Sequence, residues 1–389
     1  MNKQKSRREF IELGLKAGIA LPIASSTLAS CLPKNEGQEK GTEGSSDKLK
    51  ILILGGTSFL GPHQIASALE RGHSISTFTR GKTKPTIHSE LFDQVEQLIG
   101  DREDNLSALE NRKWDVVFDN SGRRVEWTKK SAELLKKDCD LYLYTSSTGV
   151  YFPYTKGSFK EEDEVLLELP EKVDKYLRME YDYGIMKANS ELAAIAEFGQ
   201  DKTIVVRPTY MIGPADRTDR FIHWPVRLSQ GGEVLVPGKE TDMVQYMDVR
   251  DVADWMIYLA ENKKVGTFNA VGPKQPQNVY SFIEEAASAF DVESSFVKID
   301  DHEFLKENGI EYIVPWIMPT KENQGSAKIN NEKAISNGLS FRPLKQTVKD
   351  TYDWWYSDAI SQERRDKLEQ NPTSVFSREQ SIIEKWRVR

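Results

Sequence analysis

Two side chains with complementary acid–base chemistry, Tyr183 and Lys187, stand four residues apart at the start of an alanine-rich stretch. On a helix, positions four apart lie on one face, so the phenol and the ammonium can share one pocket. A free phenol has a pKa near ~10, and a nearby cation favours the phenolate. The pair therefore predicts a base that takes a proton from a hydroxyl, whereas neighbouring Tyr181 is interpreted as a packing residue.

A Tyr-x-x-x-Lys pair is common by chance, so the elements that position it decide its meaning. Residues 49–54 predict a buried strand, which runs into the glycine-rich sequence GGTSFLG of residues 55–61 and a helical pattern over 62–71. In such a turn, glycines allow positive φ and close approach of the backbone to a pyrophosphate. The N–H groups that begin the helix can then hold the phosphate charge. Strand, turn and helix together predict a dinucleotide site.

The same alternation of strand and helix continues along the chain. Further strands are expected at residues 74–79, 95–99, 114–118, 141–144 and 203–206. A βαβ series of this kind predicts a parallel sheet with helices on both faces. We therefore expect an α/β protein with a Rossmann-type doubly wound parallel sheet in residues 49–210. Residues 211–389 are expected to form a smaller C-terminal substrate-binding region, with returning sheet elements near 241–272.

The glycine motif resembles the opening of the extended short-chain dehydrogenases, the NAD-dependent epimerase/dehydratase family, which has glycine where this chain has Ser58. Further similar segments are residues 144–151, 181–187, 207–214, 245–253, 268–273 and 331–355. The resemblance spans roughly Leu49 to Trp355. Its nearest form is a bacterial branch related to the chloroplast stem-loop RNA-binding proteins.

This resemblance implies roles for individual residues. Tyr183 would take a proton from a substrate hydroxyl as hydride leaves its carbon, Ser147 would hydrogen-bond the same oxygen, and Lys187 would complete the catalytic trio. The residues implied to bind the cofactor are Gly55, Thr57, Ser58, Phe59, Leu60, Gly61, Arg80, Asp101, Asn120, Ser121, Gly122, Tyr183, Lys187 and Pro208.

The second strand ends without the carboxylate that usually binds the adenosine ribose of NAD. Arg80 stands there instead and could pair with a 2′-phosphate, which favours NADP. The expected cofactor is NAD or NADP, tightly bound. Charged and aromatic side chains gather over residues 216–224, and Arg220, His223 and Trp224 are predicted to bind a small-molecule substrate, a sugar or sugar derivative.

These observations predict a sugar-modifying oxidoreductase or epimerase that works through hydride transfer and a keto intermediate. The alternative is a non-catalytic dinucleotide-binding or RNA-binding module of the same fold. A net charge of −7 weighs against nucleic acid as a partner. None of the five histidines stands at metal-ligand spacing, so no metal site is expected. A homodimer is left open.

The first residues predict export. Ser6-Arg7-Arg8 within a basic start resembles the twin-arginine motif, and residues 14–29 are apolar and rich in small side chains. Leu-Ala-Ser-Cys at residues 28–31 resembles a bacterial lipobox, which would place a lipid anchor on Cys31. We expect a signal peptide over 1–31, a flexible linker over 32–48, and a lipid-anchored protein of the periplasm or cell envelope. An ordinary basic signal with an incidental cysteine is the alternative.

Overall fold

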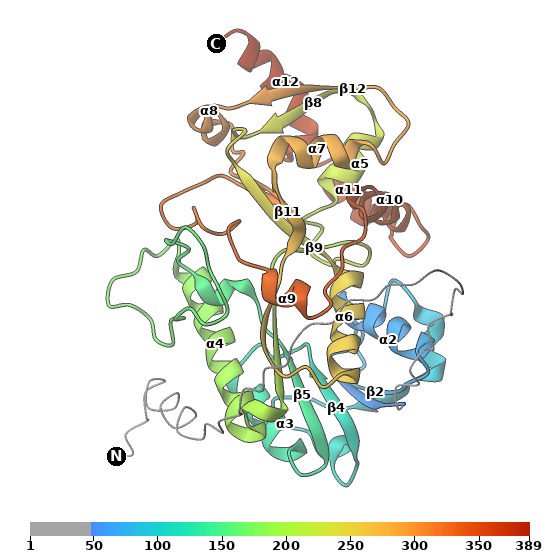
Figure 1. Ribbon diagram of the computed structural model, residues 1–389. Helices are drawn as coiled ribbons and strands as arrows, with labels where there is room; N and C mark the ends of the chain where they lie inside the picture. The colour runs from blue at the N-terminus through green and yellow to red at the C-terminus, as the bar shows by residue number, and fades with distance from the viewer. Residues whose placement is uncertain (1–47) are drawn as a thin grey trace, which may run out of the picture. The chain divides into compact units, whose positions relative to one another are not determined.

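The computed structural model describes residues 48–389, so Cys31, the expected signal peptide and nearly all of the expected linker lie outside the described residues. The largest sheet in these residues has seven strands (Figure 1). Every pair of neighbouring strands in it is parallel. In the order in which they pair, the strands are β10 (Gly266–Ala270), β6 (Thr203–Pro208), β5 (Cys139–Thr145), β4 (Trp114–Asp119), β1 (Lys50–Leu54), β2 (Ser74–Thr79) and β3 (Glu96–Ile99).

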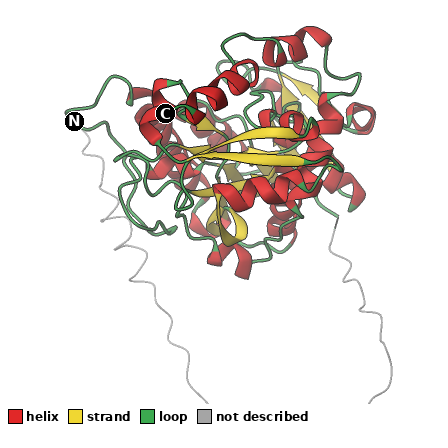
Figure 2. Ribbon diagram, turned by 90° about the horizontal axis from the view of Figure 1, so that it is seen from above, coloured by secondary structure: helices red, strands yellow, loops and turns green. Residues whose placement is uncertain are grey.

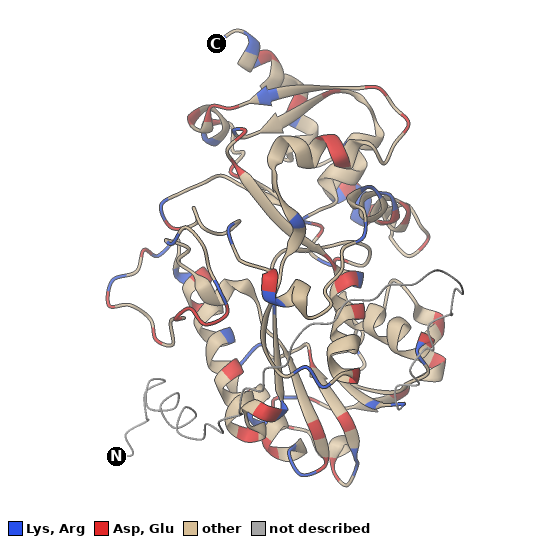
Figure 3. Ribbon diagram, viewed as in Figure 1, with Lys and Arg blue, Asp and Glu red and all other residues tan. Residues whose placement is uncertain are grey.

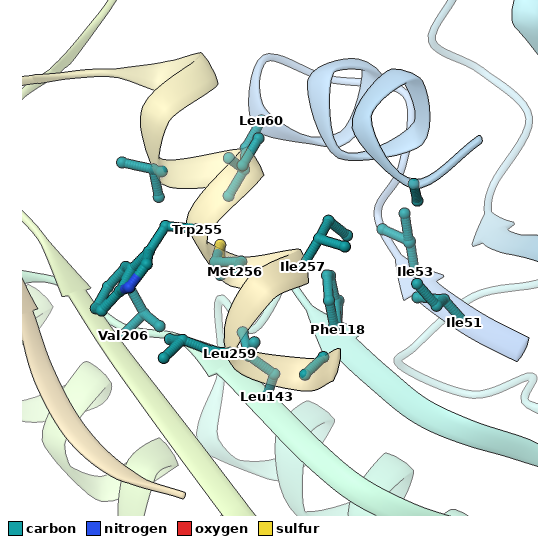
Figure 4. Close-up of a cluster of buried hydrophobic side chains, with 14 of the residues drawn as sticks. Ile51, Ile53, Leu60, Phe118, Leu143, Val206, Trp255, Met256, Ile257 and Leu259 are labelled. Carbon is teal, nitrogen blue, oxygen red and sulfur yellow. The ribbon is translucent and has the colours of Figure 1, made fainter. Parts of the chain in front are cut away.

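Successive side chains of a strand point to opposite sides of the sheet, and helices cover both of its faces. Ile51 and Ile53 face the helices α2 (Leu60–Glu70) and α6 (Val249–Glu261), and Figure 4 shows Trp255, Met256 and Leu259 of α6 meeting that face. Leu52 and Leu54 face the opposite cluster, which contains residues of α3 (Val125–Leu135) and α4 (Arg178–Phe198). Figure 2 shows helices on both sides of the strands.

The expected α/β fold with a doubly wound parallel sheet is confirmed. Each of the six strands expected from the sequence corresponds to one of β1 to β6, with ends that differ by at most two residues. The seventh strand, β10, comes from the range assigned to the C-terminal region and pairs with β6. The chain thus leaves the main sheet after β6 and returns to it with β10.

The remaining elements form a smaller region with its own core, seen at the top of Figure 1. Its strands are β7 (Met211–Ile212), β8 (Gly232–Pro237), β9 (Met243–Asp248), β11 (Gly272–Asn278), β12 (Ser294–Ile299), β13 (Tyr312–Ile313) and β14 (Trp316–Ile317). Its helices are α5 (His223–Ser229), α7 (Val279–Ala287), α8 (His302–Glu307), α10 (Leu344–Trp355), α11 (Gln362–Glu369) and α12 (Val375–Arg387). The exception is α9 (Glu332–Ser336), which packs on β10 and whose Ala334 belongs to the core of the main sheet.

Short 3₁₀ turns connect several elements: η1 (Ser89–Gln94), η2 (Ser107–Leu109), η3 (Thr148–Tyr151) and η4 (Gln200–Lys202). Of these, η3 follows the end of β5, and Ser147 is the residue directly before it. Among the helices of residues 48–389, none has the length and apolar character needed to cross a membrane.

Candidate active site

A pocket of about 600 Å³ opens at the carboxyl ends of β1, β2 and β4. Strand order reverses between β1 and β4, and such a switch point is where ligands of doubly wound sheets bind. Nine of the residues predicted to bind a cofactor line this pocket: Gly55, Thr57, Ser58, Phe59, Leu60, Arg80, Asp101, Asn120 and Ser121. A second hollow, near Lys50 and Trp114, lies at the opposite edge of the strands and contains none of them.

The glycine-rich turn is close-packed in a way that only glycine permits. Gly55 has a φ of +90°, and a Cβ added there would lie 2.7 Å from the Cβ of Ser121. A Cβ on Gly61 would lie 2.3 Å from the carbonyl oxygen of Gly56, so α2 could not approach β1 as it does. No side chain within residues 48–389 caps α2. In its first turn the N–H of Gly61 donates to the carbonyl oxygen of Ser58 at 3.1 Å and Pro62 carries no N–H, so an anion here would be held by the remaining N–H groups of the turn.

Ser58 occupies the position where the family has glycine, and the turn accommodates it. The positive φ near this point belongs to Phe59, at 39°, and not to Ser58. The side chain of Ser58 is exposed and stands on the pocket wall. The turn therefore keeps a cradle for a pyrophosphate, with one extra hydroxyl beside it. The geometry fits the predicted dinucleotide.

A buried ion pair forms the floor of the pocket. It was not predicted from the sequence. Arg102, 6% exposed, is paired through both terminal nitrogens with Asp119 at the end of β4. Although burial favours the neutral acid, the guanidinium holds the pKa of Asp119 below its usual value. Arg102 Nε is buried without a partner among the described residues, and Arg102 lines the pocket. Seventeen residues separate the two side chains, so no local pattern announces them.

The predicted catalytic residues come together at the end of β5 and the start of α4. Ser147 Oγ accepts a hydrogen bond from the N–H of Gly149 at 3.0 Å. A Cβ added to Gly149 would lie 2.9 Å from Tyr183 Cε1 and 3.3 Å from Ser147 Oγ, so both side chains border the same glycine. Tyr183 is 45% exposed and thus open to a ligand.

Lys187 lies beneath this surface as a buried cation. Its Nζ donates to the carbonyl oxygen of Thr145 at 2.9 Å and lies 5.1 Å from the centroid of the Tyr144 ring. Burial disfavours the charged form, but the phenols of Tyr144 and Tyr183 outweigh it and hold the pKa of Lys187 above its usual value. The side chain is therefore an ammonium next to Tyr183, fixed in place by the end of β5, which also lines the dinucleotide pocket through Thr145.

A network of buried polar groups stands behind the trio. One helical turn after Lys187, Glu191 accepts from Arg207 Nε at 2.8 Å and Nη2 at 2.7 Å, and from Ser146 Oγ at 2.5 Å. Arg207 also donates to the hydroxyl of Tyr151 at 2.7 Å. These contacts tie the ends of β5 and β6 to α4 and keep the catalytic side chains in register.

Five of the predicted cofactor residues lie near the pocket without lining it. Gly61 and Gly122 are buried, and a Cβ on Gly122 would lie 2.6 Å from Thr128 Oγ1, so both serve close packing. Pro208 ends β6 opposite Ala270. Tyr183 and Lys187 belong to the catalytic cluster just described.

The predicted substrate residues separate into two groups. Arg220 lies 5.6 Å from the centroid of the Tyr210 ring. Burial raises the pKa of Tyr210, and Tyr183 adds to this, so both tyrosines and Arg220 belong to one neighbourhood. The structure does not bring His223 or Trp224 there.

Trp224 is fully buried in the core of the C-terminal region. His223 meets Trp224 and Phe376 edge-on, and burial lowers the pKa of His223 to about 3. Both side chains start the short helix α5, whose residues pack inward, because burying an indole there removes apolar surface from water. The expectation that they contact a ligand is corrected on this ground.

The chain is similar in sequence to two known proteins. The chain is 30% identical over 247 residues to the chloroplast stem-loop binding protein of 41 kDa b of Arabidopsis thaliana, over 59% of this chain and 60% of that protein. It is 26% identical over 294 residues to UDP-N-acetyl-alpha-D-glucosaminuronate decarboxylase of Bacillus cytotoxicus, over 66% of this chain and 87% of that enzyme. The match thus spans less than two thirds of the chloroplast protein.

The fold is similar to that of dTDP-glucose 4,6-dehydratase of Bacillus anthracis in complex with NAD. The TM-score is 0.57 at 16% identity, over 80% of this chain and 98% of that enzyme. The family model described as "NAD dependent epimerase/dehydratase family" matches residues 51–272. This range contains the glycine-rich turn, the pocket floor and the catalytic trio. The chain belongs to the NAD-dependent epimerase/dehydratase family.

Proposed function

We propose that this protein is a sugar-modifying epimerase, dehydratase or oxidoreductase that keeps a nicotinamide dinucleotide tightly bound. The observation that carries the proposal is the meeting of Tyr183, Ser147 and buried Lys187 beside the dinucleotide pocket. A module that had lost its chemistry would have no need to keep a half-exposed phenol next to a buried ammonium.

In the proposed reaction, Tyr183 takes the proton of a substrate hydroxyl and Ser147 hydrogen-bonds the same oxygen. The ammonium of Lys187 favours the phenolate form of a neighbouring tyrosine, which is what a base near neutral pH requires. When bound, the nicotinamide supplies a reversible acceptor for the hydrogen and electrons removed from the substrate carbon. The substrate passes through a keto form, and Tyr183 can return the proton when the hydroxyl is restored.

The cofactor is proposed to be NADP. Arg80 and Lys82 line the pocket where the second strand ends, and Asp101 is the one acidic residue in its lining within the described part of the chain. A ligand with more negative charge than NAD satisfies this surplus of cations better. Asp101 and the floor of Arg102 and Asp119 would then stand near the adenine.

The experiment for the enzyme is turnover of candidate sugars by the protein as purified, with no added nucleotide. A redox-neutral cycle should give many turnovers and no lasting rise in reduced-nicotinamide absorbance. Turnover that stops after one equivalent, and resumes with an added oxidant, would identify a dehydrogenase. Native mass spectrometry of the same sample identifies the dinucleotide that co-purifies.

RNA binding is a second candidate, favoured by the match to a chloroplast stem-loop binding protein. Lysines, arginines and acidic residues are interspersed over the described elements in Figure 3. Phosphate backbones require a concentrated basic face, and the chain carries a net charge of −7. Salt-resistant binding of an RNA hairpin, with no sugar turnover, would favour this candidate over the enzyme.

The proposed location is the periplasm or cell envelope, reached through the twin-arginine-like start of the chain and held by a lipid on Cys31. A pathway that carries folded proteins would let the cofactor bind before export. Because little free nucleotide is available outside the cytoplasm, a cycle that regenerates its own cofactor suits this location.

A further inference from the structure

A smaller pocket of about 230 Å³ adjoins the dinucleotide pocket and carries a cluster of cations. The two pockets share Thr57, Ser58 and Phe59 of the glycine-rich turn, and Lys82, Thr83 and Arg217 also line both. Four basic residues line the smaller one, which we call the side pocket: Lys82, Lys84, Arg217 and Arg364. Among residues 48–389, no acidic residue lines it.

The positive charge of the side pocket is mostly unbalanced. Of its four cations, only Arg364 has a carboxylate partner among residues 48–389, because it donates to Asp219 from Nη2 at 2.6 Å and from Nε at 3.1 Å. Lys82, Lys84 and Arg217 are exposed and close to one another in a chain whose net charge is negative. Like charges gathered without counter-charges cost energy, and an anion in the pocket relieves that cost.

These cations reach the pocket from two directions. Lys82 and Lys84 follow β2 on the dinucleotide-binding side, whereas Arg217 follows β7 and Arg364 belongs to α11. The family model ends at residue 272, so Arg364 lies well outside the matched range. An anion here would be held between the sheet and the last part of the chain.

The C-terminal helices are built firmly against this spot. Phe59 of the glycine-rich turn packs on the cluster that contains Trp354 and Trp355. The Arg364 guanidinium lies 5.4 Å and 5.6 Å from these two rings, and it also donates to the carbonyl oxygen of Asp216 at 2.9 Å. Arg364 is therefore positioned before any ligand arrives, and little side-chain entropy remains to be lost on binding.

We propose that the side pocket is a phosphomonoester subsite, closed from the C-terminal side by Arg217 and Arg364. The phosphate is that of the bound dinucleotide, the 2′-phosphate of NADP. The inference rests on the proposed function, since a dinucleotide must occupy the adjoining pocket. It makes α11 part of the cofactor site, so that the last helices hold the cofactor in place.

The test compares the equilibrium binding of NADP⁺ and NAD⁺ by the purified full-length protein and three variants. Arg217→Gln and Arg364→Gln should each weaken NADP⁺ by about tenfold or more, the usual loss for a hydrogen bond to a charged group, and leave NAD⁺ within about twofold. Lys367→Gln is the matched control, because Lys367 lies in the same helix and pairs with Glu363 at the surface. It should change neither affinity.

Arg217 makes no contact that the fold depends on, so its variant remains informative even if Arg364→Gln is less stable. Equal weakening of NAD⁺ and NADP⁺, or no weakening of either, would overturn the inference. A phosphorylated sugar such as glucose 6-phosphate forms the second arm. If the two variants lose this probe and keep NADP⁺, the phosphate subsite stands but belongs to the substrate, and the assignment to the cofactor is wrong.

Failure of the wild type to bind either dinucleotide would refute the proposed function instead. Inorganic phosphate would then test whether the side pocket binds a phosphate group on its own. It should protect the wild type against thermal unfolding more than it protects Arg217→Gln, and equal protection would refute the subsite.

Discussion

Lys187 owes its position to the strand before it and its charge to the phenols around it. The hydrogen bond to the carbonyl oxygen of Thr145 and the approach to the Tyr144 ring hold the ammonium in place, and Tyr183 is among its charge-bearing neighbours. Tyr183 in contrast is half exposed and borders Gly149 with one edge of its ring. Chemistry and stability are therefore separable at this site, and substitutions can address one without the other.

Replacement of Tyr183 by phenylalanine should abolish turnover and spare the fold. The ring and its packing remain, but the proton acceptor is lost, and acid–base groups of this kind contribute about 10²–10⁴-fold to the rate. Dinucleotide binding and melting temperature should stay near wild-type values. Substantial turnover by Tyr183→Phe would mean that another group takes the proton. Tyr176→Phe, an exposed tyrosine of the loop before α4, is the control.

Arg80→Asp should exchange the preference for NADP for one toward NAD. The change removes a charge-assisted contact to a 2′-phosphate, worth roughly 1.5–3 kcal/mol, and supplies a carboxylate for the ribose hydroxyls. Titration of both dinucleotides measures the ratio of affinities. Lys129→Asp, on the exposed surface of α3, makes the same change of charge away from the pockets and should leave that ratio alone. An unchanged ratio in Arg80→Asp would remove Arg80 from the ribose site.

Strands and helices of the dinucleotide half could be predicted because each follows a local rule. Apolar runs mark the buried parallel strands, and glycine at positions 55 and 61 marks the turn between β1 and α2. The pairing of Arg102 with Asp119 could not be predicted, since it depends on the loop after β3 meeting the end of β4. The prediction for Trp224 failed for a related reason. The composition of residues 216–224 suits a sugar site, and only the inward packing of α5 shows that Trp224 belongs to a core.

Asp119, at the end of β4, is predicted to contribute strongly to the free energy of unfolding. Asp119→Ala leaves Arg102 buried without its carboxylate, a change that costs about 3–5 kcal/mol. Urea denaturation should show this loss of unfolding free energy. The double variant Arg102→Met with Asp119→Leu removes both charges and should recover part of it, because Thr128, Tyr142 and the N–H of Ser121 still lose their acceptor. A single variant as stable as wild type would mean that water reaches Arg102 in the folded protein.

Helix α2 is predicted to make the fold sensitive to acid through His63. The ring nitrogen Nε2 of His63 bonds the carbonyl oxygen of Pro214 at 3.0 Å, and burial lowers the pKa of His63 to about 4. The unfolded chain therefore binds the proton first as pH falls. The contribution of neutral His63 to the free energy of unfolding is fully present above pH ~6.5. It is lost as the pH falls from about 6.5 to 4, and the loss is on the order of 3 kcal/mol.

Chemical denaturation at several pH values measures this loss. His63→Phe should have a shallower fall in unfolding free energy over that range than the wild type. Identical slopes in the two proteins would mean that His63 does not remain neutral in the folded state.

At the scale of the whole molecule, the proposed lipid anchor and the folded part should be independent. Cys31→Ala should release the protein from membranes into the soluble fraction, with the melting temperature and dinucleotide content unchanged. Fractionation and mass spectrometry of the N-terminal residue measure both. Wild-type protein found soluble, with an unacylated N-terminus, would show that Cys31 is not an anchor.

The return of β10 to the main sheet sets the order in which this chain can be completed as it is synthesised. Every residue of β6 is buried, and five register pairs join it to β10. Until residue 270 has emerged, β6 offers an open edge to any other strand nearby. By then β7, β8 and β9 have already been made, so neither half can finish before the other begins. A fragment that stops near residue 210 would keep the edge of β6 unpaired permanently and should aggregate.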